Sequence, residues 1–267
     1  MMQKISTEKN GTKEEPLPDS DICPNCKNTG WEYYTKDGYE FAKECACGIL
    51  KKQILSRRRR FADIPEAFRD MSLNTFRLDV YETEHGKKIA SSACKAIKYW
   101  IDNLESMEER GMGLYIYSGT KGSGKTRMVA SIANELMLKK NMQVKFATSM
   151  QVLTEIKSSW DKNENYTESS LLDFLSTTEI LILDDFGTEQ VKEWIGERFY
   201  QIINNRYVDK KITIFTSNIS IEKLQYDSRI SNRIKERTFQ IPFPEESVRE
   251  HIARKNAEEL LKGMQSC

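Results

Sequence analysis

Short apolar runs alternate with longer amphipathic stretches along the chain from about residue 84 onward. The runs are almost continuously apolar, which is typical of parallel strands that a sheet buries on both faces. Between two of them, Met128, Ile132 and Leu136 give the stretch 127–140 one apolar face, as a helix packed on a sheet requires. The alternation predicts an α/β fold with a doubly wound, central parallel five-stranded sheet. The expected strands are residues 114–117, 144–147, 180–183, 212–216 and 239–241.

The chain before residue 84 follows a different pattern. Residues 1–20 are polar and lack the apolar area that would offset the entropy of ordering, so we expect a disordered tail there. Aromatic residues around a turn-prone centre predict a hairpin within 21–48, and 49–61 is helical and strongly basic. Pro65 interrupts the following stretch, as in a connector. The expected organisation is a tail at 1–20, a small module with a basic helix at 21–60, a connector at 61–83 and a large domain at 84–267.

The overall charge is nearly balanced, with 41 Lys and Arg against 40 Asp and Glu. No overall field therefore attracts the protein to nucleic acid or to a membrane surface, and any such contact needs a local patch. No apolar run approaches the roughly 18 residues of a membrane span, and the polar start of the chain has no hydrophobic signal region. We expect a cytoplasmic protein with no membrane partner.

A phosphate-binding motif follows the first predicted strand of the large domain. The pattern G-x-x-x-x-G-K-[ST] is matched by Gly119, Thr120, Lys121, Gly122, Ser123, Gly124, Lys125 and Thr126. Glycines at this place let backbone N–H groups surround an anion at a helix N-terminus. We expect Lys125 to reach the β- and γ-phosphates of ATP and the Thr126 hydroxyl to ligate Mg²⁺. A glycine-rich turn that binds nothing is the alternative, but the strand before the motif and the helix after it favour a nucleotide site.

Polar side chains follow the next strands at the edge where open α/β sheets bind ligands. Asp184 and Asp185 come directly after the strand at 180–183, and Asn218 comes shortly after the strand at 212–216. We expect Asp184 to hold Mg²⁺, Asp185 to polarise the attacking water and Asn218 to approach the γ-phosphate. Each of these residues alone would also suit a solvated turn. With Lys125, they are the candidate catalytic residues.

Four of the six cysteines form two close pairs, Cys23 with Cys26 and Cys45 with Cys47. This count suits a closed tetrahedral zinc site, and so short a segment has almost no apolar core without a metal. The second pair has one intervening residue, so its turn is tighter than is usual in zinc sites. Free cysteines or a redox pair remain alternatives.

Together these motifs resemble the AAA+ ATPases of the DnaC/DnaI helicase-loader group, in the phage and mobile-element versions with an N-terminal cysteine module. The resemblance covers roughly residues 61–250 and rests on the glycine loop, on 180–187 (ILILDDFG), on 216–218 (TSN) and on 228–233 (SRISNR). It implies an AAA+ P-loop domain that forms homo-oligomers on binding ATP or helicase. It also implies an ATP-dependent DNA replication protein that loads a DnaB-family replicative helicase onto single-stranded DNA.

The resemblance also gives roles to single arginines. Arg233 matches the arginine finger that one subunit lends to its neighbour's γ-phosphate, and Arg229 is a second candidate for that role. Arg249 matches the sensor-II arginine, which acts on the phosphates of its own subunit. Without the resemblance, a surface ion pair is the ordinary interpretation of any one of them. Many AAA+ hydrolases carry Glu where this chain has Asp185, and the shorter side chain predicts a slow, switch-like ATPase.

In the loader group the N-terminal region grips the helicase, so we expect this contact in the cysteine module. Trp31, Tyr33 and Tyr34 are its candidate anchors, or else the hairpin's own small core. The basic run of the following helix suits phosphates and acidic protein surfaces equally. Its members are Lys51, Lys52 and the four arginines 57–60.

The resemblance places single-stranded DNA at the insert 148–165. Lys157, Ser158 and Trp160 offer positive charge and a stacking face there, although Trp160 also suits the core of a helix. Two other functions share the nucleotide core: an IstB-type transposition helper that acts on duplex DNA, and an adaptor that binds ATP without hydrolysing it. The cysteine module and the short C-terminal tail favour the loader over the transposition helper.

Overall fold

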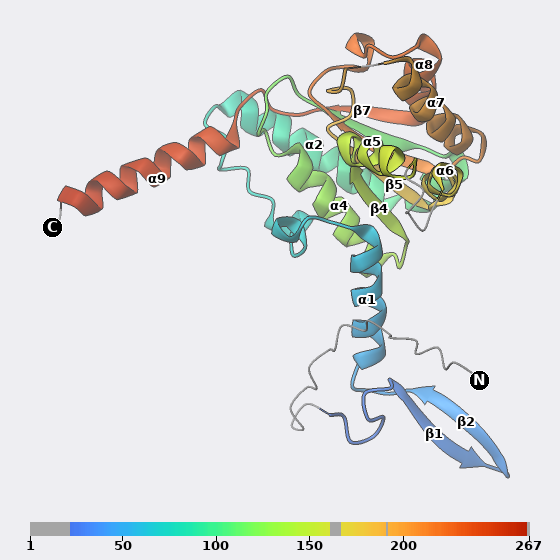
Figure 1. Ribbon diagram of the computed structural model, residues 1–267. Coiled ribbons are helices and arrows are strands. Elements are labelled where there is room, and N and C mark those ends of the chain that lie inside the picture. Colours follow the sequence, from blue (N-terminus) through green and yellow to red (C-terminus); the bar gives the residue numbers. More distant parts are fainter. Residues whose placement is uncertain (1–21, 161–166, 191, 266–267) are drawn as a thin grey trace, which may run out of the picture. The chain divides into compact units, whose positions relative to one another are not determined.

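The computed structural model describes residues 22–160, 167–190 and 192–265 (Figure 1). The chain divides into two compact units, one up to Ser56 and the other from Arg57 onward. The predicted tail at 1–20 lies outside the described residues. None of the helices within the described ranges is both long and apolar enough to cross a membrane.

The first unit contains an antiparallel hairpin of β1 (Trp31–Lys36) and β2 (Tyr39–Glu44). Asp37 and Gly38 turn the chain with φ angles of 52° and 79°, the positive values that a tight two-residue hairpin turn needs. The rings of Tyr34 and Phe41 stack across the strands with their centroids 5.6 Å apart. The predicted hairpin is therefore confirmed. Helix α1 (Ile49–Ala62) follows and confirms the predicted basic helix.

The second unit is built on a parallel sheet in the order β4-β5-β6-β3-β7. Each predicted apolar run forms one of its strands, so the predicted α/β fold with a five-stranded parallel sheet is confirmed. The strands are β3 (Gly113–Tyr117), β4 (Val144–Thr148), β5 (Ile180–Asp184), β6 (Ile212–Ser217) and β7 (Thr238–Pro242).

Helices cover both faces of this sheet (Figure 1). Alternate strand residues contribute to different core clusters: Leu114 and Ile116 pack on one face and Tyr115 on the other, as the two-residue period of a strand requires. One face carries α2 (Glu84–Asp102), α3 (Leu104–Arg110) and α4 (Lys125–Lys139). The other face carries α5 (Ser149–Ser158), α6 (Glu168–Thr177), α7 (Glu193–Val208) and α8 (Ser228–Arg237).

Short helical turns and a last helix complete the second unit. The turns are η2 (Glu66–Phe68), η3 (Leu73–Thr75) and η4 (Ile221–Lys223), and the last helix is α9 (Val248–Gln265). The connector carrying η2 and η3 is attached to α4, because the Asn134 amide donates to the carbonyl oxygens of Phe68 at 3.0 Å and of Met71 at 2.8 Å. These bonds fix the connector beside α4, the helix that starts at the glycine loop.

A buried cation joins α7 to the end of α6 and to the start of β6. Arg206 of α7 is 1% exposed, and burial lowers the pKa of its guanidinium to about 9. Its nitrogen atoms donate to carbonyl oxygens at the C-terminal end of α6 and at the start of β6. These acceptors are Leu175, Ser176, Thr178 and Ile212, together with the Thr213 hydroxyl. A helix leaves its last carbonyl groups without partners of its own, and the cation satisfies three such groups here.

Replacing Arg206 by Met removes these donors and leaves several buried carbonyl oxygens unsatisfied. We expect Arg206→Met to lower the free energy of unfolding by about 3 kcal/mol in urea denaturation. The control is Arg69→Met, because the Arg69 side chain is 51% exposed in a surface ion pair and should change stability by less than about 0.5 kcal/mol. Equal stability of the two variants would contradict a stabilising role for the Arg206 hydrogen bonds.

Candidate nucleotide-binding site

The glycine loop joins the end of β3 to the start of α4, as the sequence predicts. Gly122 and Gly124 have φ angles of 79° and 99°, in the region that favours glycine. A Cβ at Gly122 would lie 3.1 Å from the Arg249 side chain, and one at Gly124 would lie 3.2 Å from the Tyr81 hydroxyl. The loop thus needs glycine for both its backbone conformation and its neighbours. The N-terminus of α4 faces the loop and favours an anion there.

Lys125 begins α4 and is 5% exposed. Its Nζ atom donates to the carbonyl oxygens of Ser118 at 3.2 Å and Thr120 at 3.1 Å, which are neutral acceptors. Burial lowers the pKa of Lys125, because the ammonium is partly withdrawn from water. A charge held this way is well placed to bind an anion such as a phosphate.

Thr126 and Asp184 meet at the base of the loop. The Thr126 hydroxyl lies 3.0 and 3.2 Å from the two carboxylate oxygens of Asp184, and the Thr216 hydroxyl donates to the same carboxylate at 2.5 Å. Burial raises the pKa of Asp184 to about 6. Hydroxyl and carboxylate oxygens are the ligands that Mg²⁺ prefers, so the residues present fit a magnesium ion bound beside a phosphate.

Asp185 follows with a φ angle of 55°, a left-handed conformation that few residues other than glycine adopt, Asp and Asn more often than the rest. Its backbone N–H donates to the Thr216 hydroxyl at 2.9 Å, and its side chain is exposed. Thr216 therefore contacts both members of the acid pair. The backbone turn gives the two neighbouring carboxylates different surroundings, one buried beside Thr126 and one open to solvent.

A cavity of about 410 Å³ lies over the glycine loop. It brings together most of the expected site residues: 121–126 of the loop, Asp185, Asn218 and Arg249. Gly119 and Thr120 do not line it. Instead, the Gly119 N–H donates to Glu245 at 2.8 Å and the Thr120 hydroxyl donates to the same carboxylate at 2.9 Å. Phe68, Thr188, Val248 and Ile252 complete the lining with Arg127.

Several residues that shape this site carry no motif in the sequence. Glu245 lies 126 positions from Gly119 in the sequence. Tyr81 donates to the Ser123 carbonyl oxygen at 2.8 Å and lies 42 positions from Ser123. The Val248 N–H also donates to the Gly122 carbonyl oxygen at 3.0 Å. No local sequence pattern predicts contacts between residues so far apart in the chain. Thr216 is the first residue of the TSN signal, but nothing in that signal indicates that its hydroxyl contacts the acid pair.

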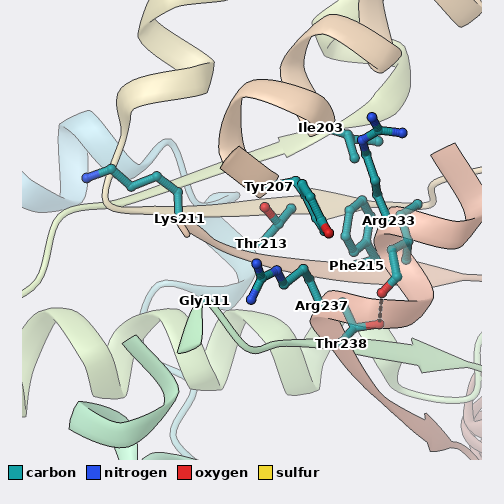
Figure 2. A pocket seen from close by; sticks show the side chains of 10 residues that line it. Gly111, Ile203, Tyr207, Lys211, Thr213, Phe215, Arg233, Arg237 and Thr238 are labelled. Carbon is teal, nitrogen blue, oxygen red and sulfur yellow. Dashed lines mark hydrogen bonds between the residues drawn. The ribbon is translucent and has the colours of Figure 1, made fainter. Parts of the chain in front are cut away.

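The candidate arginine fingers lie away from this cavity in the single chain. Arg233 packs on the rings of Tyr200 and Tyr207, 5.1 and 5.5 Å from their centroids. With Tyr207 and Arg237 it lines a separate small pocket (Figure 2). Arg229 pairs with Asp227 at 3.0 Å. One chain does not bring these arginines to the glycine loop, and their role in a neighbouring subunit's site stays a prediction.

The four cysteine sulfurs of the first unit lie within 4.8 Å of one another. Sγ atoms of Cys23 and Cys45 are 3.7 Å apart, and those of Cys26 and Cys47 are 3.6 Å apart. Zinc–sulfur bonds of about 2.3 Å in a tetrahedron separate the sulfurs by about 3.8 Å. The tight second pair therefore still reaches the geometry of a closed site, and the cluster fits a zinc ion.

The expected DNA-contacting insert is partly described. Lys157 lies 5.6 Å from the ring centroid of Trp194. Trp160 meets the same ring edge to face and is 53% exposed, so it is not part of a helix core. Ser158 ends α5 and is half-buried. Residues 161–166 of the insert lie outside the described ranges.

Comparison with known proteins confirms the resemblance to the loader group. The chain is 26% identical over 220 residues to the phage-like element PBSX protein XkdC of Bacillus subtilis, covering 80% of this chain and 78% of that protein. It is 33% identical over 135 residues to the replicative helicase loader DnaI of Bacillus subtilis, covering 49% and 42% of the two chains. The crystal structure of the DnaC helicase loader shares the fold, with a TM-score of 0.53 and 23% identity over 67% of this chain and 99% of that one.

A family assignment follows from a match that spans more than half of the chain. Residues 75–240 match the family described as the bacterial DnaA ATPase domain. This range contains the glycine loop, the acid pair and the whole parallel sheet except the last residues of β7. The chain therefore belongs to the bacterial DnaA ATPase domain family and has the AAA+ P-loop fold.

Proposed function

We propose that this protein is an ATP-dependent DNA replication factor that loads a DnaB-family replicative helicase onto single-stranded DNA. One observation carries the proposal: Thr126 of the glycine loop lies 3.0 Å from the Asp184 carboxylate, at the base of a cavity that Asp185, Asn218 and Arg249 also line. Phosphate donors, magnesium ligands and residues able to act on a γ-phosphate are thus combined in one site. The relatives' names supply the replication context.

Each side chain has a task that its surroundings support. Lys125 and the loop N–H groups bind the phosphates, and bound Mg²⁺ neutralises part of their charge. Thr126 and Asp184 hold that ion. Asp185 orients water at the γ-phosphate with the help of Asn218. Arg249, whose side chain lies against Gly122, acts on the phosphates of its own subunit.

Oligomerisation completes the site in this proposal. Arg233 is stacked on tyrosine rings outside the cavity, a place from which it can serve a neighbouring subunit and not its own. A guanidinium that enters from another subunit typically changes phosphoryl-transfer rates by about 10³ to 10⁵. Turnover is then slow in the isolated chain, and the short Asp185 side chain in place of Glu adds to this. The ATPase acts as a switch during assembly.

The cysteine module is the proposed helicase-binding element, folded by zinc. Its hairpin exposes Trp31 by 41%, Tyr33 by 74% and Tyr34 by 45%, so these rings are available as anchors for a partner. Single-stranded DNA is assigned to the surface around Lys157 and Trp160, where an exposed indole offers a stacking face. The basic run of α1 remains an open candidate for either partner.

Replacing Lys125 by Ala tests the nucleotide site. We expect magnesium-dependent ATP turnover to fall by at least about 100-fold, because the phosphates lose the buried cation at the start of α4. Lys139→Ala is the matched control on the same helix, since its side chain is 61% exposed and pairs with Glu135. ATP binding with no measurable turnover in the wild type would instead favour the adaptor.

Replacing Cys45 by Ser tests the metal centre. The wild type should carry one zinc ion per chain by elemental analysis, and Cys45→Ser should lose it because three thiolates no longer close the site. Cys94→Ser is the control, since Cys94 is half-buried against the core of the second unit and should retain zinc. Purified wild type without bound metal after growth with added zinc would contradict the centre.

The loader assignment is tested by binding of the full chain to a purified DnaB-family helicase. We expect a stable complex, and Tyr33→Ala should weaken it by at least about tenfold, as loss of an exposed aromatic anchor does. Tyr99→Ala removes a comparably exposed tyrosine, 65% exposed on α2, and should leave affinity unchanged. No complex with the helicase, together with binding to a transposase on duplex DNA, would favour the transposition helper.

A further inference from the structure

A buried carboxylate that the proposed mechanism does not use lies in the loop after β5. Glu189 is 8% exposed, and burial raises its pKa above the usual value for glutamate. Its carboxylate oxygens contact the Ser149 hydroxyl at 3.0 Å, the Gly187 N–H at 3.3 Å and the Tyr226 hydroxyl. These partners come from three separate segments of the chain. Burying a carboxylate costs free energy, and these hydrogen bonds offset part of that cost.

Ser149 connects this carboxylate to Asp185. Its hydroxyl lies 3.0 Å from the Asp185 carbonyl oxygen and 3.0 Å from a Glu189 oxygen, and a hydroxyl has one proton to donate. When Glu189 carries a proton, it can donate to Ser149, and Ser149 then donates to Asp185. The Thr188 hydroxyl donates to the same carbonyl oxygen at 2.9 Å.

These bonds hold an unfavourable backbone conformation. Asp185 has a φ of 55°, which costs about 1 kcal/mol or more for a residue with a side chain. Its N–H donates to the Thr216 hydroxyl at 2.9 Å, and the Phe186 N–H donates to the Thr216 carbonyl oxygen at 2.8 Å. The Asp185 carbonyl oxygen accepts from the hydroxyls of Ser149 and Thr188. Glu189 orients the Ser149 hydroxyl, so losing the Glu189 contact changes one of the two hydroxyl bonds at that carbonyl oxygen. The Asp185 side chain then loses its fixed direction toward the cavity.

The same carboxylate reaches the start of α8. Tyr226 directly precedes Asp227, the N-cap of α8, and its ring stacks on Phe186 with a centroid distance of 4.9 Å and an angle of 13°. Phe186 is the residue after Asp185. Hydroxyl and ring of Tyr226 thus both contact the turn that carries Asp185, and α8 carries Arg229 and Arg233.

We propose that Glu189 is a positioning residue, which fixes Asp185 in its cavity-facing conformation through Ser149 and joins that turn through Tyr226 to the arginine-bearing helix α8. The inference rests on the proposed function, in which Asp185 orients the attacking water. Glu189 lines no part of the nucleotide cavity and does not touch ATP in this scheme. It affects turnover through Asp185, and nucleotide binding, which depends on the glycine loop, is independent of it.

The test compares four variants of the full chain with the wild type: Glu189→Ala, Glu189→Gln, Tyr226→Phe and Asp185→Asn. Affinity for a fluorescent ATP analogue with Mg²⁺, steady-state ATP turnover and thermal unfolding are measured for each. We expect Glu189→Ala to lower turnover about tenfold or more, because small displacements of a group that orients a reactant have large effects. Its nucleotide affinity should stay within about twofold of the wild type.

The conservative variants separate positioning from simple stability. Glutamine has the shape of glutamate and can both donate to Ser149 and accept from Tyr226, so Glu189→Gln should keep turnover within about threefold of the wild type. Tyr226→Phe keeps the ring stacked on Phe186 but loses the hydroxyl, and should reduce turnover with no loss of nucleotide affinity. Both variants remain informative if Glu189→Ala fails to fold.

Opposite results have distinct meanings. Wild-type turnover in both Glu189→Ala and Tyr226→Phe, with Asp185→Asn impaired, overturns the positioning role and leaves the proposed function intact. A parallel fall of affinity, turnover and melting temperature in both also overturns it, since that pattern indicates a structural role alone. If the wild type shows no magnesium-dependent affinity for the analogue, the proposed function itself fails.

Discussion

The contact of Asp184 with two threonine hydroxyls is the interaction on which the rest of the site depends. Thr126 comes from the glycine loop and Thr216 from the neighbouring strand β6, so one carboxylate joins the phosphate loop to the sheet edge. The carboxylate is 3% exposed, and burial raises its pKa to about 6. At neutral pH it is therefore ionised at a cost to the stability of the fold. That cost is relieved by a cation placed between Asp184 and bound phosphates, which is the arrangement that a magnesium nucleotide supplies.

The parallel sheet explains why these groups meet. The register pairs Leu183 with Phe215 and Ile116 with Thr216, so Asp184, Thr216 and the start of the glycine loop end on one edge. Apolar runs, a helical period and a motif of fixed spacing are local signals, and for this reason the strands, α4 and the loop could be predicted from the sequence. The acid pair was predictable for the same reason, because the edge that follows a parallel strand is known once the strand is.

Other parts of the site depend on contacts that no local pattern encodes. Glu245 holds the start of the glycine loop and Tyr81 holds Ser123 only because β7 and the connector pack beside β3 and α4. From the sequence, Glu189 cannot be distinguished from other polar loop residues, yet it is buried among Ser149, Gly187 and Tyr226. Burial of a polar side chain is a result of tertiary packing, so its significance appears only with the structure. The cysteines are the opposite case, since metal chemistry restricts their arrangement so strongly that spacing alone predicted the cluster.

The two acids at the end of β5 differ in how they are held: one is buried and fixed, and the other is exposed. Asp184 is immobilised by burial and hydroxyl contacts, which suits the metal ligand that we propose, whereas Asp185 is exposed and its neighbours hold it in a left-handed turn. A strained backbone conformation depends on each bond that holds it. Two of the contacts at this turn come from Ser149 at the start of α5 and from Tyr226 just before α8. Helix α8 presents its arginines on tyrosine rings, outside the chain's own cavity. Under the proposed function, the turn at Asp185 connects the nucleotide of one subunit with the arginines offered to the next, because Tyr226 contacts both Glu189 and Phe186 directly before α8 begins.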